Sequence, residues 1–178
     1  MERDDHMAKK RSTARRMVYR SATSKFRPIQ RRSSAGTVTA RRHTITFQFF
    51  VAKETPTAEK IRVIRRGVGA RVVDEMVRYL DVPKNLVFSV LHTPESTAHR
   101  LIRDNRPLDS AASERVVRVA DVIRVAEEVF GGREAATRWL KTPNLALGDE
   151  TPLSMLDTEP GATEVRRILS SINYGGTF

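Results

Sequence analysis

The stretch VPKNLVFSVLHTPESTAHRLIRDN, residues 82–105, has the form of a helix-turn-helix. Pro83 suits the first turn of a helix, because its missing N–H would have no partner there. The helix that it opens carries its apolar residues on one face, namely Leu86, Val87, Val90 and Leu91. The sequence His92-Thr93-Pro94 breaks this helix, and a second helix follows before Pro107. We therefore expect a supporting helix, a tight break and a second helix.

The second helix has an outer face that is polar and basic. Leu101 and Ile102 can dock its inner face. The residues that can then meet DNA are Ser96, Thr97, His99, Arg100 and Arg103. Early residues of such a helix reach base edges, and arginines reach phosphate or guanine. A generic helical hairpin gives a similar pattern, and this region is nearly neutral where DNA-binding domains usually show a basic patch. Pattern alone leaves both interpretations open.

Helical periodicity continues on both sides of this stretch. Thr57 can cap a helix that presents Ile61, Ile64 and Val68, and another helix spans about 70–80. A long helix begins at about Asp109 and stops at Gly131-Gly132. Its apolar stripe consists of Val116, Val119, Ala120, Ile123, Ala126 and Phe130. Shorter helical pieces follow over 133–140, 151–156 and 161–173. The predicted fold class is all-α, with two small subdomains joined through the long helix.

The positive charge of the chain is concentrated at its beginning. The 178 residues carry a formal net charge of +11, and residues 1–50 hold 13 Lys and Arg against 3 Asp and Glu. Residues 1–43 lack apolar periodicity and are predicted to be disordered. Such an arm can hold nucleic acid phosphates, or it can be upstream sequence before a later start at Met7 or Met17. The following TITFQFFVA, residues 44–52, alternates like a strand, although one strand alone is not stable.

Several classes of protein are disfavoured by composition and motif. Cysteine is absent, no apolar run is long enough for a membrane span, and no signal peptide opens the chain, so we expect a cytoplasmic protein. GVGARV, residues 67–72, lacks the third glycine of a dinucleotide-binding loop and is better interpreted as a break between two helices. The four histidines lack metal-ligand spacing. We expect no enzyme, no cofactor and no metal site.

The last third of the chain carries a series of ordered motifs: Ser113-Glu114-Arg115 at the start of the long helix, VFGG, A-x-x-W-L, P-N-x-A-L-G, T-P-L-x-M-L, G-A-x-E-V and a closing I-N-Y-G. By these motifs it resembles the Xre/MbcA/ParS antitoxins. The predicted domains are a basic arm at 1–56 with a possible strand at 44–52, an Xre-like helix-turn-helix domain at 57–108, and a toxin-binding domain with a C-terminal tail at 109–178.

The resemblance implies the antitoxin of a type II toxin–antitoxin system. Its partner would be a RES-domain toxin, whose fold is similar to ADP-ribosyltransferases and which consumes NAD or transfers ADP-ribose. The tail of the antitoxin would enter the toxin active site, the helix-turn-helix would bind operator DNA and repress the operon, and an antitoxin homodimer would hold two toxins in a heterotetramer. The toxin-binding residues carried over by position are Trp139, Asn144, Leu147, Gly148, Pro152, Met155, Asn173, Tyr174 and Gly175. The alternative is a transcriptional regulator whose C-terminal domain only dimerises.

The closing sequence SSINYGGTF, residues 170–178, suits such a tail because it is aromatic and free of charge. Tyr174 offers an apolar ring with a hydrogen-bonding tip, a frequent profile at binding hot spots. Gly175 and Gly176 let the backbone pass close to a cleft wall. The alternative is that Tyr174 and Phe178 fold back onto their own domain. Trp139, the only tryptophan, can belong to the core and shape the interface from behind.

Overall fold

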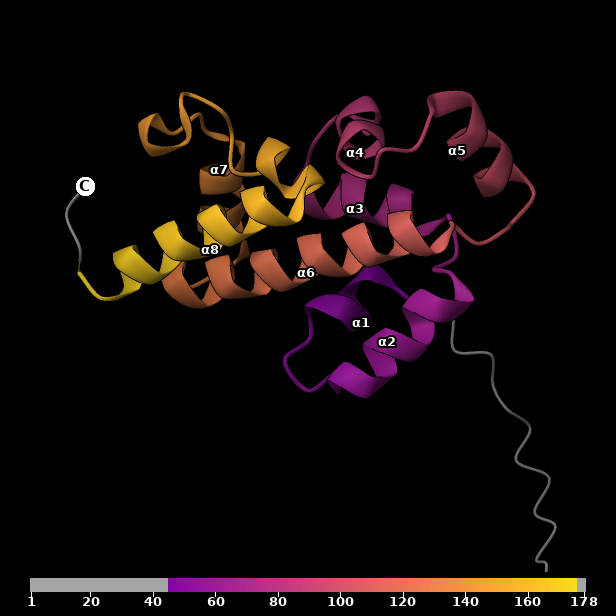
Figure 1. The fold of residues 1–178 in the computed structure, drawn as a ribbon, viewed down its shortest axis with the longest axis horizontal. Coiled ribbons are helices and arrows are strands. Elements are labelled where there is room, and N and C mark those ends of the chain that lie inside the picture. Colours follow the sequence, from indigo (N-terminus) through magenta and orange to yellow (C-terminus); the bar gives the residue numbers. More distant parts are fainter. Residues whose placement is uncertain (1–44, 176–178) are drawn as a thin grey trace, which may run out of the picture. The chain divides into compact units, whose positions relative to one another are not determined.

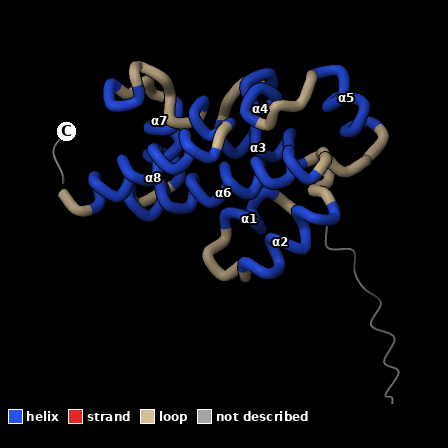
Figure 2. Tube along the Cα trace, viewed as in Figure 1, coloured by secondary structure: helices blue, strands red, loops and turns tan. Residues whose placement is uncertain are grey.

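The computed structural model describes residues 45–175, and every regular element in that range is helical (Figures 1 and 2). The α-helices are α1 (Phe47–Val51), α2 (Thr57–Arg66), α3 (Val72–Leu80), α4 (Lys84–Val90), α5 (Glu95–Arg103), α6 (Ser110–Phe130), α7 (Arg133–Lys141) and α8 (Glu159–Asn173). Two 3-10 helices, η1 (Leu145–Leu147) and η2 (Ser154–Asp157), lie between α7 and α8. The predicted all-α class is confirmed. The predicted disordered arm at 1–43, Gly176, Thr177 and Phe178 lie outside the described residues.

The long helix α6 is the element against which most others pack. Its start is fixed by Asp109, whose side chain accepts a hydrogen bond of 2.7 Å from the backbone N–H of Ala112. It ends at Gly131, which has a φ of 76° and supplies the left-handed turn that a side chain would resist. Helices α1, α2, α7 and α8 contact α6 (Figure 1). The predicted stripe is buried from Val116 to Ala126, and Phe130 is half-buried.

The two predicted subdomains share a single hydrophobic core. Its buried side chains run along the chain from Phe47 to Leu169, and the described residues belong to one compact unit. The helix-turn-helix contributes Phe88 and Leu91 to this core, and the region after α6 contributes Leu140 and Leu156. Helix α4 also contacts η2 directly. A movement of the helix-turn-helix relative to the region after α6 would therefore disturb core packing that both share.

The predicted strand at 44–52 is wrong, because residues 47–51 form the helix α1. Phe47, Phe50 and Val51 are buried at helical spacing against α3 and α6. The ring of Phe47 meets Tyr79 edge to face at 5.3 Å, and its backbone N–H donates to the carboxylate of Glu75 at 2.5 Å. A helix satisfies its own backbone groups, whereas a lone strand would leave them without partners. This segment therefore belongs to the folded body, not to the arm at 1–56.

The break between α2 and α3 is a close backbone contact. Pro56, not Thr57, occupies the position before α2. Of the predicted inward face, Val68 is buried and Ile64 packs against the core, but Ile61 is wrong because it is 41% exposed. After α2, Gly69 forms an antiparallel bridge with Pro107. Gly67 has a φ of 85°, and a Cβ there would lie 2.5 Å from the Leu108 carbonyl oxygen. The glycines of GVGARV serve this break between helices, as the sequence indicated.

Ser113 fixes this break to α6. Its hydroxyl donates to the Asp109 carbonyl at 2.6 Å and accepts from the backbone N–H of Val68 at 2.9 Å. Both Ser113 and Val68 are buried. The serine of the Ser-Glu-Arg motif is therefore a structural residue that positions the α2–α3 loop on the amino end of α6.

Candidate functional site

Helices α4 and α5 form the predicted helix-turn-helix. The chain reverses at His92, which has a φ of 49°. The backbone N–H of Thr93 donates to the Phe88 carbonyl at 3.0 Å and closes the turn. Ala98 is fully buried on the inner face of α5, and Leu101 and Ile102 are half-buried beside the core, as predicted. The rest of α5 is left to face solvent.

The predicted DNA-contacting residues lie on α5. Ser96, His99, Arg100 and Arg103 are exposed and Thr97 is half-buried. His99 packs edge-on against Phe88 at 5.3 Å, and its Nε2 lies 3.3 Å from a carboxylate oxygen of Glu95. Arg103 Nε donates to Asp104 at 2.9 Å, and this hydrogen bond lowers the pKa of the Asp104 carboxyl. Unlike His99 and Arg103, Arg100 forms no ion pair with another described residue, so its guanidinium group is free to contact a phosphate or a base.

The P-N-x-A-L-G motif folds into a tight turn around η1. The Asn144 side chain accepts from the backbone N–H of Ala146 at 2.9 Å, and its carbonyl accepts from the N–H groups of Leu147 and Asp149. Its own N–H donates to the Glu150 carbonyl at 3.0 Å. Gly148 closes the turn with a φ of 68°. The motif thus encodes a rigid loop whose backbone groups are satisfied internally.

This turn separates two leucines of opposite roles. Leu147 is 8% exposed and anchors the turn in the core. Leu145 is 86% exposed. The turn around Asn144 therefore holds one large apolar side chain out toward solvent. Sequence reasoning missed Leu145, since a three-residue helix has no periodicity from which to tell the inward leucine from the outward one.

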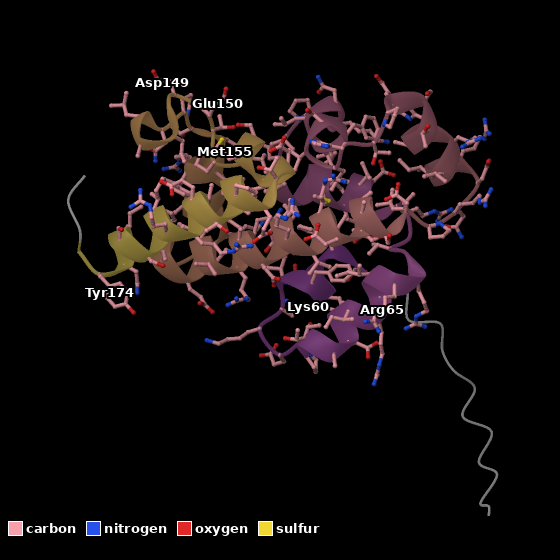
Figure 3. The ribbon with its side chains drawn as sticks, in the orientation of Figure 1. Lys60, Arg65, Asp149, Glu150, Met155 and Tyr174 are labelled. Carbon is pink, nitrogen blue, oxygen red and sulfur yellow. The ribbon has the colours of Figure 1, made fainter. Side chains whose placement is uncertain are left out.

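The other predicted toxin-binding residues differ in exposure. Pro152 is buried, and Asn144 and Met155 are half-buried. Trp139 is also half-buried, and its ring lies 5.4 Å from the Phe130 ring. Gly148, Asn173, Tyr174 and Gly175 are exposed. The candidate surface therefore comes from two segments, the loop between α7 and α8 and the end of α8 (Figure 3).

Tyr174 is presented to solvent at the end of α8. Its backbone N–H donates to the Ser170 carbonyl at 3.1 Å, and the side chain is 87% exposed. Gly175 follows with a φ of 73°, and its N–H donates to the Ile172 carbonyl at 3.1 Å. The alternative in which Tyr174 folds back onto its own domain is not observed. Figure 3 shows Tyr174 apart from the loop that carries Asp149 and Glu150.

Two arginines of α6 hold the loop between α7 and α8 in place. Arg118 donates to the Asp157 carbonyl at 3.2 Å and pairs with Glu114 at 2.6 Å and Glu159 at 3.0 Å. Arg115 donates to the same carbonyl at 3.3 Å. Its side chain also approaches the Leu91 carbonyl, where the helix-turn-helix breaks, at 3.5 Å. These contacts connect the end of η2 to both α6 and α4.

An open hollow of about 1080 Å³ beside α7 does not have the character of an anion site. Arg133 stacks on the Tyr79 ring at 4.0 Å and donates to the Arg78 and Tyr79 carbonyls. Lys141 donates to the Asp81 carbonyl at 3.0 Å. Both cations are thereby engaged at the end of α3.

Within residues 45–175 no group of three or more His, Asp and Glu side chains is placed to hold a metal ion. No helix in that range is long and apolar enough to cross a membrane.

Two family models match the chain. Residues 59–121 match the model of the antitoxin Xre-like helix-turn-helix domain. Residues 125–175 match the model of the antitoxin Xre/MbcA/ParS C-terminal toxin-binding domain. The first match contains α4 and α5, and the second contains η1, η2 and the end of α8.

Similar proteins are named as antitoxins. The Prs ADP-ribosylating antitoxin of Sphingobium sp. is 30% identical over 126 residues, which cover 66% of this chain and 79% of that protein. Antitoxin Xre of Yersinia enterocolitica is 32% identical over 114 residues, covering 63% of this chain and 76% of the relative. Antitoxin Xre of Pseudomonas putida is 37% identical over 82 residues, covering 46% and 52%. The chain belongs to the Xre/MbcA/ParS antitoxin family, and it is an antitoxin that joins an Xre-like helix-turn-helix domain to a C-terminal toxin-binding domain.

Proposed function

We propose that this antitoxin neutralises a RES-domain toxin by placing the tail that begins at Asn173 in the toxin active site. The observation that carries the proposal is the 87% exposure of Tyr174 at the end of α8, beside a left-handed Gly175. The family resemblance supports a toxin whose fold is similar to ADP-ribosyltransferases. The name of the Sphingobium relative, a Prs ADP-ribosylating antitoxin, accords with that chemistry.

The structure of the tail stem favours binding energetically. Ordering a free residue costs about 1–2 kcal/mol of backbone entropy. Tyr174 and Gly175 are already hydrogen-bonded to the last turn of α8, so this cost is largely met before the toxin arrives. Full burial of a large apolar side chain is worth about 1.5–3 kcal/mol, which is enough to exceed the remaining ordering cost at Tyr174. A cleft that accepts the aromatic base and ribose hydroxyls of NAD also suits a phenol ring with a polar tip.

Leu145 provides a second anchor in this account. It lies 86% exposed on the turn that Asn144 and Gly148 close, and the exposed Asp149 and Glu150 follow it. The toxin surface that receives this loop would have an apolar depression with a basic rim. An anchor on a rigid turn loses little entropy on binding, which increases affinity. Trp139, Leu147 and Pro152 would then act as supports of the loop, and Met155 as a flanking contact.

We also propose that the antitoxin represses its own operon through α5. Ser96, Thr97, His99, Arg100 and Arg103 lie along this helix, which enters the major groove in helix-turn-helix proteins. Binding would require His99 and Arg103 to exchange their contacts with Glu95 and Asp104 for bases or phosphates. A homodimer holding two toxins, as the family resemblance implies, would place two such helices on one operator.

Growth of a bacterial host that expresses the adjacent open reading frame tests the neutralisation mechanism. The host would also express the full chain, a version ending at Asn173, or the Tyr174→Ala variant. We expect the full chain to rescue growth and the other two to fail. The Ile61→Ala variant is a matched control, because Ile61 is an exposed apolar residue on α2, and it should rescue.

The other outcomes are equally informative. Rescue by the version ending at Asn173 would refute insertion of the tail and leave neutralisation to the loop around Leu145. A neighbouring gene that is harmless in every case, together with full operator binding by the chain, would favour a regulator whose C-terminal domain only dimerises.

A further inference from the structure

The loop between α2 and α3 meets the loop between α5 and α6 at the amino end of α6 (Figure 1). The backbone N–H of Ala70 donates to the Arg106 carbonyl at 3.0 Å, and that of Leu108 donates to the Val68 carbonyl at 2.8 Å. These two bonds flank the bridge between Gly69 and Pro107. Ala70 therefore stands opposite Arg106, and Arg71 follows Ala70 directly, so the two arginines belong to facing loops although 35 positions separate them in the sequence.

Both arginines are exposed, and they extend a set of cations that begins on α5. Arg66 lies in the last turn of α2 beside this bridge, and Arg100 and Arg103 lie in the last turn of α5. Arg66, Arg71, Arg100 and Arg106 form no ion pair with another described residue. The nearby carboxylates are engaged, because Asp104 pairs with Arg103 and Asp109 caps α6. Exposed arginines without an ion pair to another described residue therefore occur on α5, at the end of α2 and in both loops of the bridge.

We propose that Arg71 and Arg106 bind phosphates of the DNA backbone beside the groove that α5 enters. This inference rests on the proposed operator binding and extends it to a surface outside the helix-turn-helix. The bridge fixes the two backbones, and Ser113 holds the bridge on α6, so the arginines are carried by rigid structure. Contacts of this kind fix the register of a protein on DNA and contribute affinity without reading sequence.

The dependence of DNA affinity on salt tests this role directly. Dissociation constants of the full chain would be measured by fluorescence anisotropy at several salt concentrations on two duplexes. One duplex is taken from directly upstream of the coding sequence, and the other is a shuffled duplex of equal composition. Each phosphate contact contributes about −0.9 to the slope of log affinity against log salt. Loss of two contacts in the Arg71→Gln/Arg106→Gln variant should make this negative slope shallower by about 1.8 on both duplexes. The affinity lost between about 50 and 200 mM salt should then be about twelvefold smaller than for the parent chain.

A matched control is the Arg78→Gln/Arg138→Gln variant. Both residues are exposed, neither forms an ion pair with another described residue, and the change in net charge is the same. The salt dependence of its affinity should equal that of the parent chain. The Arg71→Lys/Arg106→Lys variant keeps both positive charges, so its salt dependence should be close to that of the parent chain. Residues 1–44 are present in every variant, so their contribution cancels. An unchanged slope in Arg71→Gln/Arg106→Gln, or an equal loss in the control, would overturn the proposal.

Failure of operator recognition gives a different result. If the parent chain does not prefer the upstream duplex, the proposal that α5 reads the operator sequence fails. A shallower salt dependence in Arg71→Gln/Arg106→Gln would still support the phosphate contacts. If that variant keeps its slope but loses its preference for the upstream duplex, the arginines read bases and the phosphate role is refuted. Absence of binding to both duplexes at low salt would refute both proposals.

Discussion

Gly161 is the position at which one added carbon should disturb the toxin-binding domain most. It lies in the first turn of α8, where a Cβ would stand 2.1 Å from the Met155 carbonyl oxygen and 3.0 Å from the Thr158 hydroxyl. Ordinary contacts of a Cβ begin at 3.4 Å. The closest atom belongs to the backbone of η2, which Arg118 also holds through the Asp157 carbonyl. The Gly161→Ala substitution must therefore move η2 and α8 apart by more than 1 Å.

The cost of this movement can be estimated. Overpacking of a well-packed site costs about 1–3 kcal/mol and occasionally more. Alanine regains up to about 1 kcal/mol through its helix preference. Because the clash at Gly161 involves backbone and not a flexible side chain, we expect a net loss of about 2–4 kcal/mol. A chain of this size loses about 2–4 °C in Tm per kcal/mol, so the Tm should fall by about 5–15 °C.

Thermal unfolding of the full chain, followed by circular dichroism, measures this effect. Gly69→Ala is the matched control, since no atom lies within 4 Å of its added Cβ. Its Tm should stay within about 3 °C of the parent chain. The steric argument fails if Gly161→Ala unfolds within about 2 °C of the parent chain, or if the two variants lose the same Tm.

Three further substitutions test other parts of the account. Ser113→Ala leaves the buried N–H of Val68 without its acceptor, and urea unfolding should show a loss of about 1–3 kcal/mol; an unchanged midpoint would contradict this. Leu145→Ser should leave the Tm unchanged because the side chain is 86% exposed, yet toxin affinity in calorimetry should fall about tenfold or more. A hydrogen bond from Arg166 lowers the pKa of Glu159, so its stabilising contribution is present above the unfolded pKa of about 4.3 and disappears as pH falls through the folded pKa. The Tm of Glu159→Gln should therefore fall less than that of the parent chain between about pH 6 and pH 3, and parallel curves would refute the role of Glu159.

The elements that carry local signals could be predicted from the sequence. The long helix α6 has an aspartate cap, a continuous apolar stripe and a glycine stop, and each signal acts within a few residues. The same holds for the helix-turn-helix, where Pro83 and Pro94 immediately precede the two helices. For these elements the sequence determines the structure without reference to distant partners.

Helix α1 could not be predicted in this way because its conformation depends on tertiary contacts. In a five-residue element, alternation of apolar residues and helical spacing cannot be distinguished. Phe47 and Phe50 form a helix because α3 and α6 offer a surface that buries them, together with the Glu75 carboxylate that accepts from the Phe47 N–H. These partners lie far along the chain.

The candidate site shows the same division. The motifs located the loop between α7 and α8 and the end of α8, but they did not distinguish Leu145, which is exposed, from Leu147, which is buried. That difference arises from the hydrogen-bonded turn around Asn144. Similarly, no local pattern predicts that the loops of Arg71 and Arg106 face each other, because the bridge and its backbone hydrogen bonds join segments far apart in the sequence.

Site-specific photo-crosslinking from position 174 tests the central claim most directly. Benzoylphenylalanine in place of Tyr174 keeps an aromatic ring at a position that is 87% exposed, and the complex with the purified product of the adjacent gene would be irradiated and mapped by mass spectrometry. The account predicts crosslinks to toxin peptides that line the NAD-binding cleft, and predicts that a substrate analogue bound there suppresses them. Crosslinks to the outer surface of the toxin, or to the antitoxin itself, would contradict insertion of the tail.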